Sequence, residues 1–362
     1  IELTVVPGGD SRQQSIAIAL TEVNHDAEIV LVHDAARAFT PTEVFDRVVN
    51  EVRETGFGVV PVVAVHDTVK RADGLILGPA ATYDFKDPAK GEINPSAYFR
   101  KNLDLFANIR PARTYDGVPY KSVSPFDLVV VRENTEGFYA DRNVESGNSE
   151  ILVTPDVAIS LRRITRDCCE RIARSAFQLA MQRRRHLTLV HKHNVLKITD
   201  GIFLDACHRV AAEFPEVTVD DIIVDAMMAH VVRAPDRFDV IVTTNMFGDI
   251  LSDLTAELSG SLGLGGSLNA GLHNAMGQAA HGSAPDIAGQ DIANPLSLVT
   301  SAAMLLGWHA HRSGNQAYLQ ASRAIEAAIT TCIAAGESTR DIGGKLGTHA
   351  TGQALVKRLQ QS

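Results

Sequence analysis

Short runs of β-branched and apolar residues alternate with amphipathic segments along the first part of this sequence. Residues 2–6, 28–33 and 58–65 have the composition of strands, and residues 12–23 and 42–52 have the spacing of helices. Consecutive parallel strands need a crossover between them, and an amphipathic helix supplies it. The order therefore predicts an α/β protein with a largely parallel sheet covered by helices.

The same kind of alternation continues through the rest of the chain. A short strand is expected at 75–77, followed by a loop over 78–95. Further strands are expected at 128–132, 187–191, 218–224 and 240–243. Helices are expected at 161–181, 201–213, 250–258 and 296–335.

Composition excludes several classes of function. The 362 residues include 34 basic and 43 acidic ones, for a net charge of −9, which does not suit nucleic acid or an anionic membrane. No apolar stretch approaches the roughly 20 residues needed to cross a bilayer. The length suits two domains or one two-lobed unit. The four cysteines are Cys168, Cys169, Cys207 and Cys332. Because they lack the spacing of a zinc site or a disulfide framework, we expect reduced thiols and a cytoplasmic location.

Two aspartates follow the apolar run at 240–242. Asp249 and Asp253 are four residues apart at the start of an expected helix, so both carboxylates project from one helical face. Two like charges this close are stabilised by a cation between them, and Mg²⁺ or Mn²⁺ prefers such oxygen ligands. The alternative is that the helix dipole stabilises the first aspartate at the helix N-terminus and that the second faces solvent.

Three arginines interrupt an otherwise apolar or neutral stretch. Arg100, Arg110 and Arg132 could converge on a di- or tricarboxylate, because guanidinium groups bind carboxylates through paired planar hydrogen bonds. Three scattered surface arginines are the alternative.

Lys192 and Tyr139 form a candidate acid–base pair. Lys192 follows an apolar strand, and Tyr139 follows the acidic segment 133–136. A lysine near a metal and a second cation can lose its proton near neutral pH, and a tyrosine can then deliver one. A surface lysine and a packing tyrosine are the ordinary alternatives.

A loop of small residues follows His281, and Asp286 is its most informative side chain. Small residues allow the backbone to approach a flat adenine. A carboxylate at Asp286 could accept both ribose hydroxyls of NAD and would repel a 2′-phosphate. A plain surface turn is the alternative.

Long motifs in order give the chain a resemblance to a known family. They are FRKNLDLFANIRPAR from Phe99, VVRENTEGFYA from Val130, HKHNVLK from His191, VDAMMAHVVRAPDRFDVIVTTNMFGDILSDL from Val224 and HGSAPDIAGQDIANP from His281. From about Ala72 onward the sequence resembles the isocitrate/isopropylmalate dehydrogenases, which are metal-dependent β-decarboxylating enzymes. The resemblance implies a two-lobed α/β fold, with a discontinuous larger lobe (1–105 and 260–362) and a smaller lobe (106–259) that carries the contact of a homodimer.

The same resemblance implies roles for particular residues. Lys192 would take up the hydroxyl proton at C2, and Tyr139 would protonate C3. The metal ligands would be Asp225, Asp249 and Asp253, and the substrate carboxylates would meet Arg100, Arg110 and Arg132. Asn194 would lie near the nicotinamide, and the other cofactor-binding residues would be His281, Gly282, Ser283, Ala284, Pro285, Asp286 and Asn294. In a dimer, Lys192 and Asp225 would enter each site from the neighbouring subunit.

The sequence departs from the family pattern at the substrate pocket. Ser96 and Ala97 occupy the places of two leucines that contact the isopropyl group in isopropylmalate enzymes. Together with Asn94, Ser96 is similar to the polar pair of isocitrate enzymes with the order exchanged. A polar or small substituent is therefore expected on the substrate. The acidic residue expected beside the nicotinamide ribose is displaced by one position, at Glu92.

Residues before about Arg71 resemble an internal piece of 2-C-methyl-D-erythritol 4-phosphate cytidylyltransferase. The segments are VVPGGDSRQQS, VLVHDAARAF and PVVAVHDTVKR, and the resemblance puts Arg12, Ser15, Asp34, Arg37, Thr68 and Lys70 in or near a substrate pocket. No Gly-rich basic loop precedes them, so a working transferase is not expected. Residues 5–10 imitate the opening of a dehydrogenase. The piece either fills the missing sheet positions or marks a junction from gene assembly.

We therefore predict an enzyme that decarboxylates a malate-type 2-hydroxy acid oxidatively, using NAD and Mg²⁺ or Mn²⁺. Three alternatives remain open: a catalytically impaired chimaeric protein that acts as a structural or regulatory dimer, a cytidylyltransferase, and a nucleic-acid binder, which the charge disfavours most.

Overall fold

The computed structural model describes residue 50 and residues 73–80, 94–138 and 149–361. The chain divides into two compact units, Ile1–Thr68 and Val69–Ser362, and the elements described below lie in the second. The division falls close to the change of resemblance near Arg71. The strands expected at 2–6, 28–33 and 58–65 and the helix at 12–23 lie outside the described residues, as does the helix at 42–52 except for residue 50.

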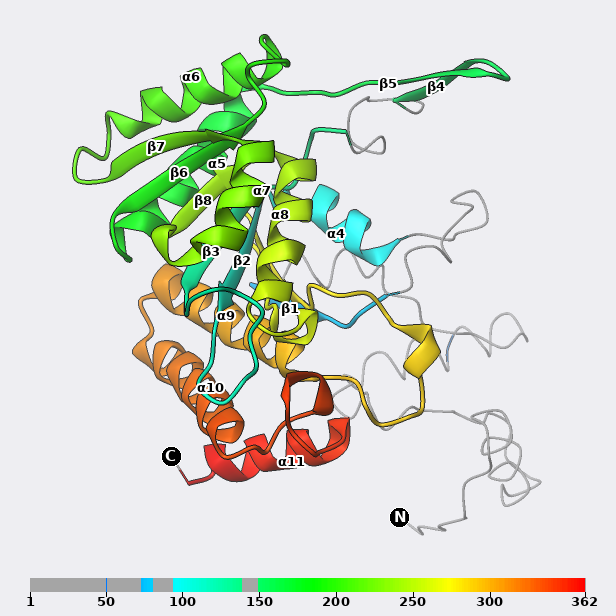
Figure 1. Ribbon diagram of the computed structural model, residues 1–362, viewed down its shortest axis with the longest axis vertical. Coiled ribbons are helices and arrows are strands. Elements are labelled where there is room, and N and C mark those ends of the chain that lie inside the picture. Colours follow the sequence, from blue (N-terminus) through cyan, green and yellow to red (C-terminus); the bar gives the residue numbers. More distant parts are fainter. Residues whose placement is uncertain (1–49, 51–72, 81–93, 139–148, 362) are drawn as a thin grey trace. The chain divides into compact units, whose positions relative to one another are not determined.

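An eight-stranded mixed sheet organises the described part of the chain. Its order is β1-β10-β9-β2-β3-β8-β6-β7 (Figure 1). The bounds are β1 (Gly74–Leu77), β10 (Ala275–Gln278), β9 (Leu268–Ala270), β2 (Ala107–Arg113), β3 (Asp127–Glu133), β8 (Val240–Thr243), β6 (His186–His191) and β7 (Thr218–Ile223). The predicted α/β class is confirmed.

The sheet is less parallel than the sequence predicted. Strands β3, β8, β6 and β7 run parallel, as do β1 and β10, but β10 with β9, β9 with β2, and β2 with β3 are antiparallel. Only residues 271–274 join β9 to β10, and residues 114–126 join β2 to β3 without a helix. Such connections form antiparallel pairs, because a parallel pair needs a longer crossover.

Alternate residues of β3 pack on opposite faces of the sheet. Val129 and Val131 pack with α5 (Arg166–Met181) and α6 (Thr199–Ala211), whereas Leu128 and Val130 pack with α7 (Val224–Arg233) and α8 (Asn245–Leu258). Successive strand side chains point to opposite faces, so a strand covered on both sides is apolar throughout. The site lies on the α8 face of this core.

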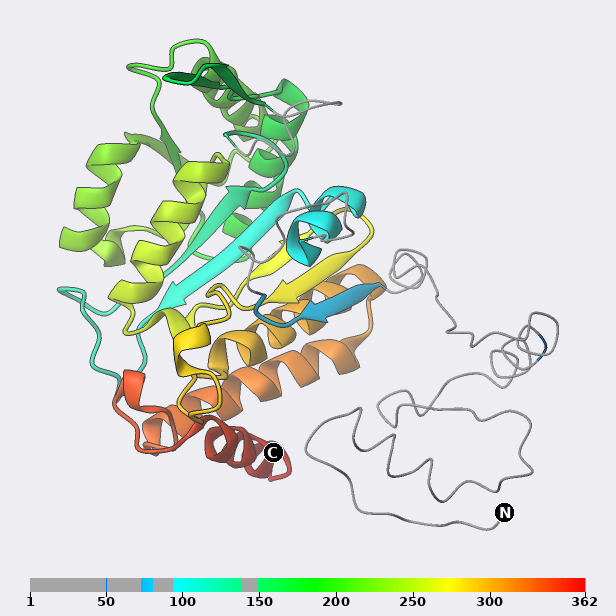
Figure 2. The same cartoon turned by 90° about the vertical axis from the view of Figure 1, so that its right-hand side faces the viewer.

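The C-terminal part is a layer of three helices, in which the first packs on the β1 side of the sheet, the second on the first, and the third on the second. They are α9 (Leu296–Ser313), α10 (Gln316–Ala334) and α11 (Thr348–Leu359), and Figure 2 shows α9 and α10 side by side along the sheet. The helical stretch expected over 296–335 is divided into α9 and α10. Gly314 ends α9 in the left-handed region at φ 70°, and Asn315 then caps α10 by accepting from the Ala317 N–H at 3.0 Å.

Several elements were not predicted. Helix α4 (Pro95–Asn102) begins where the Asn94 side chain accepts the N–H groups of Ser96 and Ala97. Strands β4 (Glu150–Thr154) and β5 (Val157–Ser160) form a separate antiparallel hairpin that projects from the sheet (Figure 1). Short 3₁₀ helices cover Pro235–Arg237, Leu262–Leu264, Pro285–Ile287 and Arg340–Ile342.

Among the helices that the structure describes, none is both long enough and apolar enough to traverse a bilayer. All four cysteines are free thiols, and three of them are buried.

Candidate active site

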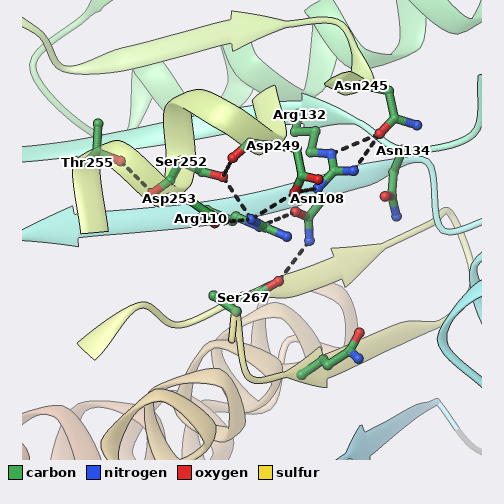
Figure 3. Close-up of polar contacts among 12 residues, drawn as sticks. Asn108, Arg110, Arg132, Asn134, Asn245, Asp249, Ser252, Asp253, Thr255 and Ser267 are labelled. Atoms are coloured by element: carbon green, nitrogen blue, oxygen red, sulfur yellow. Dashed lines mark hydrogen bonds and ion pairs between the residues drawn. The ribbon is translucent and has the colours of Figure 1, made fainter. Parts of the chain in front are cut away.

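A polar stripe on α8 faces two buried arginines from neighbouring strands (Figure 3). Arg110 of β2 places Nη1 at 3.3 Å from Asp249 Oδ1, 3.1 Å from Asp253 Oδ1 and 2.8 Å from Ser252 Oγ. Arg132 of β3 pairs with Asp249 from the other side. The predicted placement of Asp249 and Asp253 on one helical face is therefore present, and both carboxylates contact Arg110.

Buried amides hold the two guanidinium groups in place. Asn108 accepts from Arg110 Nε at 2.6 Å, and Asn245 accepts from Arg132 Nε at 2.9 Å and Nη2 at 2.7 Å. Asn108 in turn donates to Ser267 Oγ at 2.8 Å, linking β2 to the strand beside it. Because both asparagines are fully buried, these bonds fix the arginines more firmly than exposed bonds would.

Gly248 allows α8 to approach Arg132 closely. A Cβ atom at this glycine would lie 2.7 Å from both Cβ and Cγ of Arg132, and Arg132 is only 1% exposed. A residue larger than glycine would therefore displace the arginine or the helix.

Burial and neighbouring charges oppose each other at Asp253. Burial raises the pKa of Asp253, Arg110 and Arg132 act to lower it, and the nearby Asp249 carboxylate raises it further. The net shift of the pKa is upward, chiefly because of burial, with the neighbouring carboxylate adding to it. A bound divalent cation would favour the charged form of both.

Arg100 lies on a different wall of the site. Its Nη2 is 3.4 Å from Gln278 Oε1, to which Ser96 Oγ also donates at 3.0 Å. Ser96 and Arg100 are one turn apart on α4, so they share a helical face. Gln278 connects onward, because its N–H donates to the Ser267 carbonyl. A chain of polar contacts thus joins Arg100 to the Arg110 cluster.

Lys192 and Asp225 form a second, separate polar pair. Lys192 follows β6, Asp225 lies in the first turn of α7, and the ammonium group contacts the carboxylate. The hydrogen bond from Lys192 holds the pKa of Asp225 below its usual range. His191, just before Lys192, accepts the His193 N–H on Nδ1, so its Nε2 donates to Asp221 at 3.1 Å.

One chain brings two of the three predicted metal ligands together. No group of three or more Asp, Glu, His or Cys side chains suited to a metal occurs among the described residues, because Asp225 lies with Lys192 and not with Asp249. The paired carboxylates of Asp249 and Asp253 still supply the hard oxygen ligands that Mg²⁺ or Mn²⁺ prefers. A third protein ligand would have to come from elsewhere. Tyr139 and Glu92 lie outside the described residues.

The predicted cofactor loop is exposed. Ala284 adopts the left-handed region at φ 44°, and the 3₁₀ turn Pro285–Ile287 then presents Asp286 at the surface. Asn294 is buried, donating to Asp341 at 2.9 Å and accepting from the Leu296 N–H. Asn194 is exposed beyond Lys192. The remaining predicted contacts, His281, Gly282 and Ser283, lead into the turn.

Several site residues were missed at the sequence level. Asn245 and Ser252 lie four before and three after Asp249, and Asn108 lies two before Arg110, so helical and strand periodicity could have indicated them. Gln278 gave no local signal, because its partners are on α4.

Comparisons with known proteins identify the family of the chain. The family model of isocitrate/isopropylmalate dehydrogenases matches residues 22–357, beginning within the N-terminal segment. An isocitrate/homoisocitrate dehydrogenase of Thermus thermophilus is 43% identical over 79% of this chain and 80% of its own length. A 3-isopropylmalate dehydrogenase of Methanothermobacter thermautotrophicus is 42% identical over 72% and 75%. The crystal structure of isocitrate dehydrogenase from Methylococcus capsulatus has a TM-score of 0.72, with 38% identity over 86% and 88%.

The fold, the arginine–aspartate cluster and these relatives define an α/β decarboxylating dehydrogenase that acts on a CH–OH donor. Within that class, the chain belongs to the isocitrate/isopropylmalate dehydrogenase family. The family uses NAD or NADP with Mg²⁺ or Mn²⁺ and acts on small hydroxy acids.

Proposed function

We propose that this protein uses NAD and Mg²⁺ or Mn²⁺ to decarboxylate a malate-type 2-hydroxy acid of the isocitrate, isopropylmalate or tartrate class. The observation that carries the proposal is the cluster in which the buried Arg110 and Arg132 face the more exposed Asp249 and Asp253. The arginines supply fixed donors for substrate carboxylates, and the aspartates supply ligands for a cation.

Substrate binding and proton transfer would fall to different residues of the site. Arg110 and Arg132 exchange their aspartate partners for the substrate carboxylates, with Arg100 contributing from α4. Lys192 would take up the hydroxyl proton at C2, and Tyr139 would protonate C3 after the β-carboxylate has left as CO₂. Bound NAD⁺ would supply the acceptor for the C2 hydride. Asp249 and Asp253 would hold a divalent cation, which would supply charge stabilisation as the β-carboxylate leaves.

A homodimer with composite sites completes this proposal. Asp225 and Lys192 are apart from the Asp249 cluster in one chain, and apolar side chains are exposed beside both groups. Val195 is 64% exposed and Ile198 80% near Lys192, and Ile250 is 54% exposed next to Asp249. The β4–β5 hairpin also exposes apolar side chains, and an isolated two-stranded hairpin is marginally stable. These surfaces suit a second copy of the chain.

The test is NADH formation with Mn²⁺ across isocitrate, isopropylmalate, malate and tartrate, followed by product analysis. One acid should give NADH and CO₂ in equal amounts, and chelation should abolish both. NADH without CO₂ would contradict the decarboxylating function, and no NADH with any of the acids would contradict this choice of substrates and cofactor.

We expect Asp286 to select NAD over NADP. Asp286→Lys should narrow or invert the preference, because it removes a repulsion of the 2′-phosphate worth about 1–3 kcal/mol. The measurement is kcat/KM for each nucleotide. Asp205→Lys makes the same change of charge at an exposed position on α6 and should leave the ratio unchanged. Equal use of both nucleotides by the unmodified protein would contradict the prediction.

We expect isopropylmalate to be no better a substrate than isocitrate or tartrate. With Ser96 and Ala97 in the pocket, an isopropyl group loses apolar contact worth roughly 1–3 kcal/mol. Ala97→Leu restores apolar surface while leaving the Ser96–Gln278 hydrogen bond in place, and should raise the relative kcat/KM for isopropylmalate about tenfold. A strong isopropylmalate preference in the unmodified protein would show that other residues build the pocket.

A further inference from the structure

A buried ion pair between Arg162 and Asp200 contacts the backbone of Lys192. Arg162 Nη1 is 2.6 Å from Asp200 Oδ1, with the Arg162 side chain 7% exposed and Asp200 completely buried. Arg162 also donates to Thr199 Oγ1 at 2.7 Å and to Thr244 Oγ1 at 3.1 Å. The guanidinium is therefore anchored to the first turn of α6 and to the residue that precedes α8.

The second carboxylate oxygen of Asp200 binds the backbone of Lys192, the candidate base. Asp200 Oδ2 accepts the N–H of Lys192. The Lys192 carbonyl accepts from the N–H groups of Val195 at 3.0 Å and Leu196 at 2.8 Å. The backbone of Lys192 is thus held on both sides, and its side chain extends to Asp225.

We propose that Asp200 is a positioning residue for Lys192, with Arg162 holding the orientation of its carboxylate; the inference rests on the proposed role of Lys192 as the base. Burying two charges is costly unless the geometry satisfies both. Here each Asp200 oxygen has one donor, and Arg162 has several acceptors. The arrangement fixes the point from which the Lys192 side chain reaches the reacting hydroxyl.

The direction of these hydrogen bonds makes the proposal testable. Arginine can only donate, so in Asp200→Asn the amide oxygen must face Arg162 and the amide NH₂ must face the Lys192 N–H. Two donors then oppose each other, and Lys192 is displaced. A displacement of about 1 Å is expected to lower kcat about 100-fold with little change in KM.

Replacing Arg162 as well should reverse the displacement of Lys192 that Asp200→Asn causes. In the double variant Arg162→Gln/Asp200→Asn, the glutamine can accept from the asparagine NH₂, so the asparagine oxygen turns to the Lys192 N–H. Its kcat should return to within about tenfold of the unmodified value. In Arg162→Gln alone, the glutamine amide can still donate to Asp200 Oδ1 while Asp200 accepts from the Lys192 N–H, so this variant should retain most of kcat. A merely structural ion pair predicts the reverse order, with the double variant at least as impaired as Asp200→Asn.

The experiment measures kcat and KM for the three variants with the preferred acid, NAD and Mn²⁺, together with amide hydrogen exchange of residues 187–198. Asp200→Asn should lose protection at Lys192, and the double variant should regain it. Unchanged protection in Asp200→Asn, or no recovery of kcat in the double variant, would overturn the proposal. If Asp200→Asn does not fold, the other two variants provide the test. Protection of Lys192 and kcat retained in both would support the proposal, and loss of either in the double variant would overturn it. If the unmodified protein forms no NADH, the proposed function fails while hydrogen exchange still tests the contact.

Discussion

Mixing two inactive variants, Lys192→Ala and Asp249→Asn, should restore about a quarter of the unmodified activity. Each variant alone should be nearly inactive, because one loses the base and the other a metal ligand. Lys192 and Asp249 belong to separate polar groups in the chain, and we propose that each site takes one group from each subunit. After unfolding and refolding an equal mixture, about half of the dimers are hybrids with one intact site of two.

The matched control mixes Lys192→Ala with Asp225→Asn. Lys192 and Asp225 lie in the same group, so every hybrid carries one lesion in each site and no activity should return. Mass spectrometry confirms the hybrids in both mixtures. Absence of recovery in the first mixture, with hybrids present, would show that the sites are not shared in this way.

Gly248→Ala should lower kcat/KM about 100-fold or more. The new Cβ would meet Arg132 Cβ and Cγ at 2.7 Å, and the buried arginine would have to leave its contacts with Asn245 and Asp249. Misplaced by about 1 Å, the guanidinium no longer matches a substrate carboxylate. The same overpacking should destabilise the fold by about 1–3 kcal/mol, measured by urea unfolding.

Gly352→Ala provides the control for this substitution. Gly352 lies within α11, and a Cβ there meets nothing within 4 Å. The change should stabilise the protein by about 0.4–1 kcal/mol and leave kcat/KM unchanged. Normal kinetics in Gly248→Ala would mean that Arg132 does not bind substrate in its present position.

The elements whose burial follows a local period were predictable. The helix over 161–181 corresponds to α5, whose apolar residues recur at helical spacing, and the strand over 128–132 corresponds to β3, whose continuous apolar run indicates a strand covered on both faces. The shared face of Asp249 and Asp253 followed from the same periodicity. Helix α4 was missed although Asn94 suits an N-cap and Pro95 a first helical position, since its apolar pattern is weak and it begins where the expected loop over 78–95 ends.

The sequence by itself determined the α/β class, five of the eight strands of the described sheet and the residue types of the site. Only the tertiary structure decided the antiparallel placement of β2, β9 and β10, because the partner of a strand is not encoded in its own period. It also decided which groups meet. Asn245 orients Arg132 from 113 positions away in the chain, and Arg162 meets Asp200 across 38. Hydrogen bonds of that separation leave no local pattern, since they depend on how the whole chain packs.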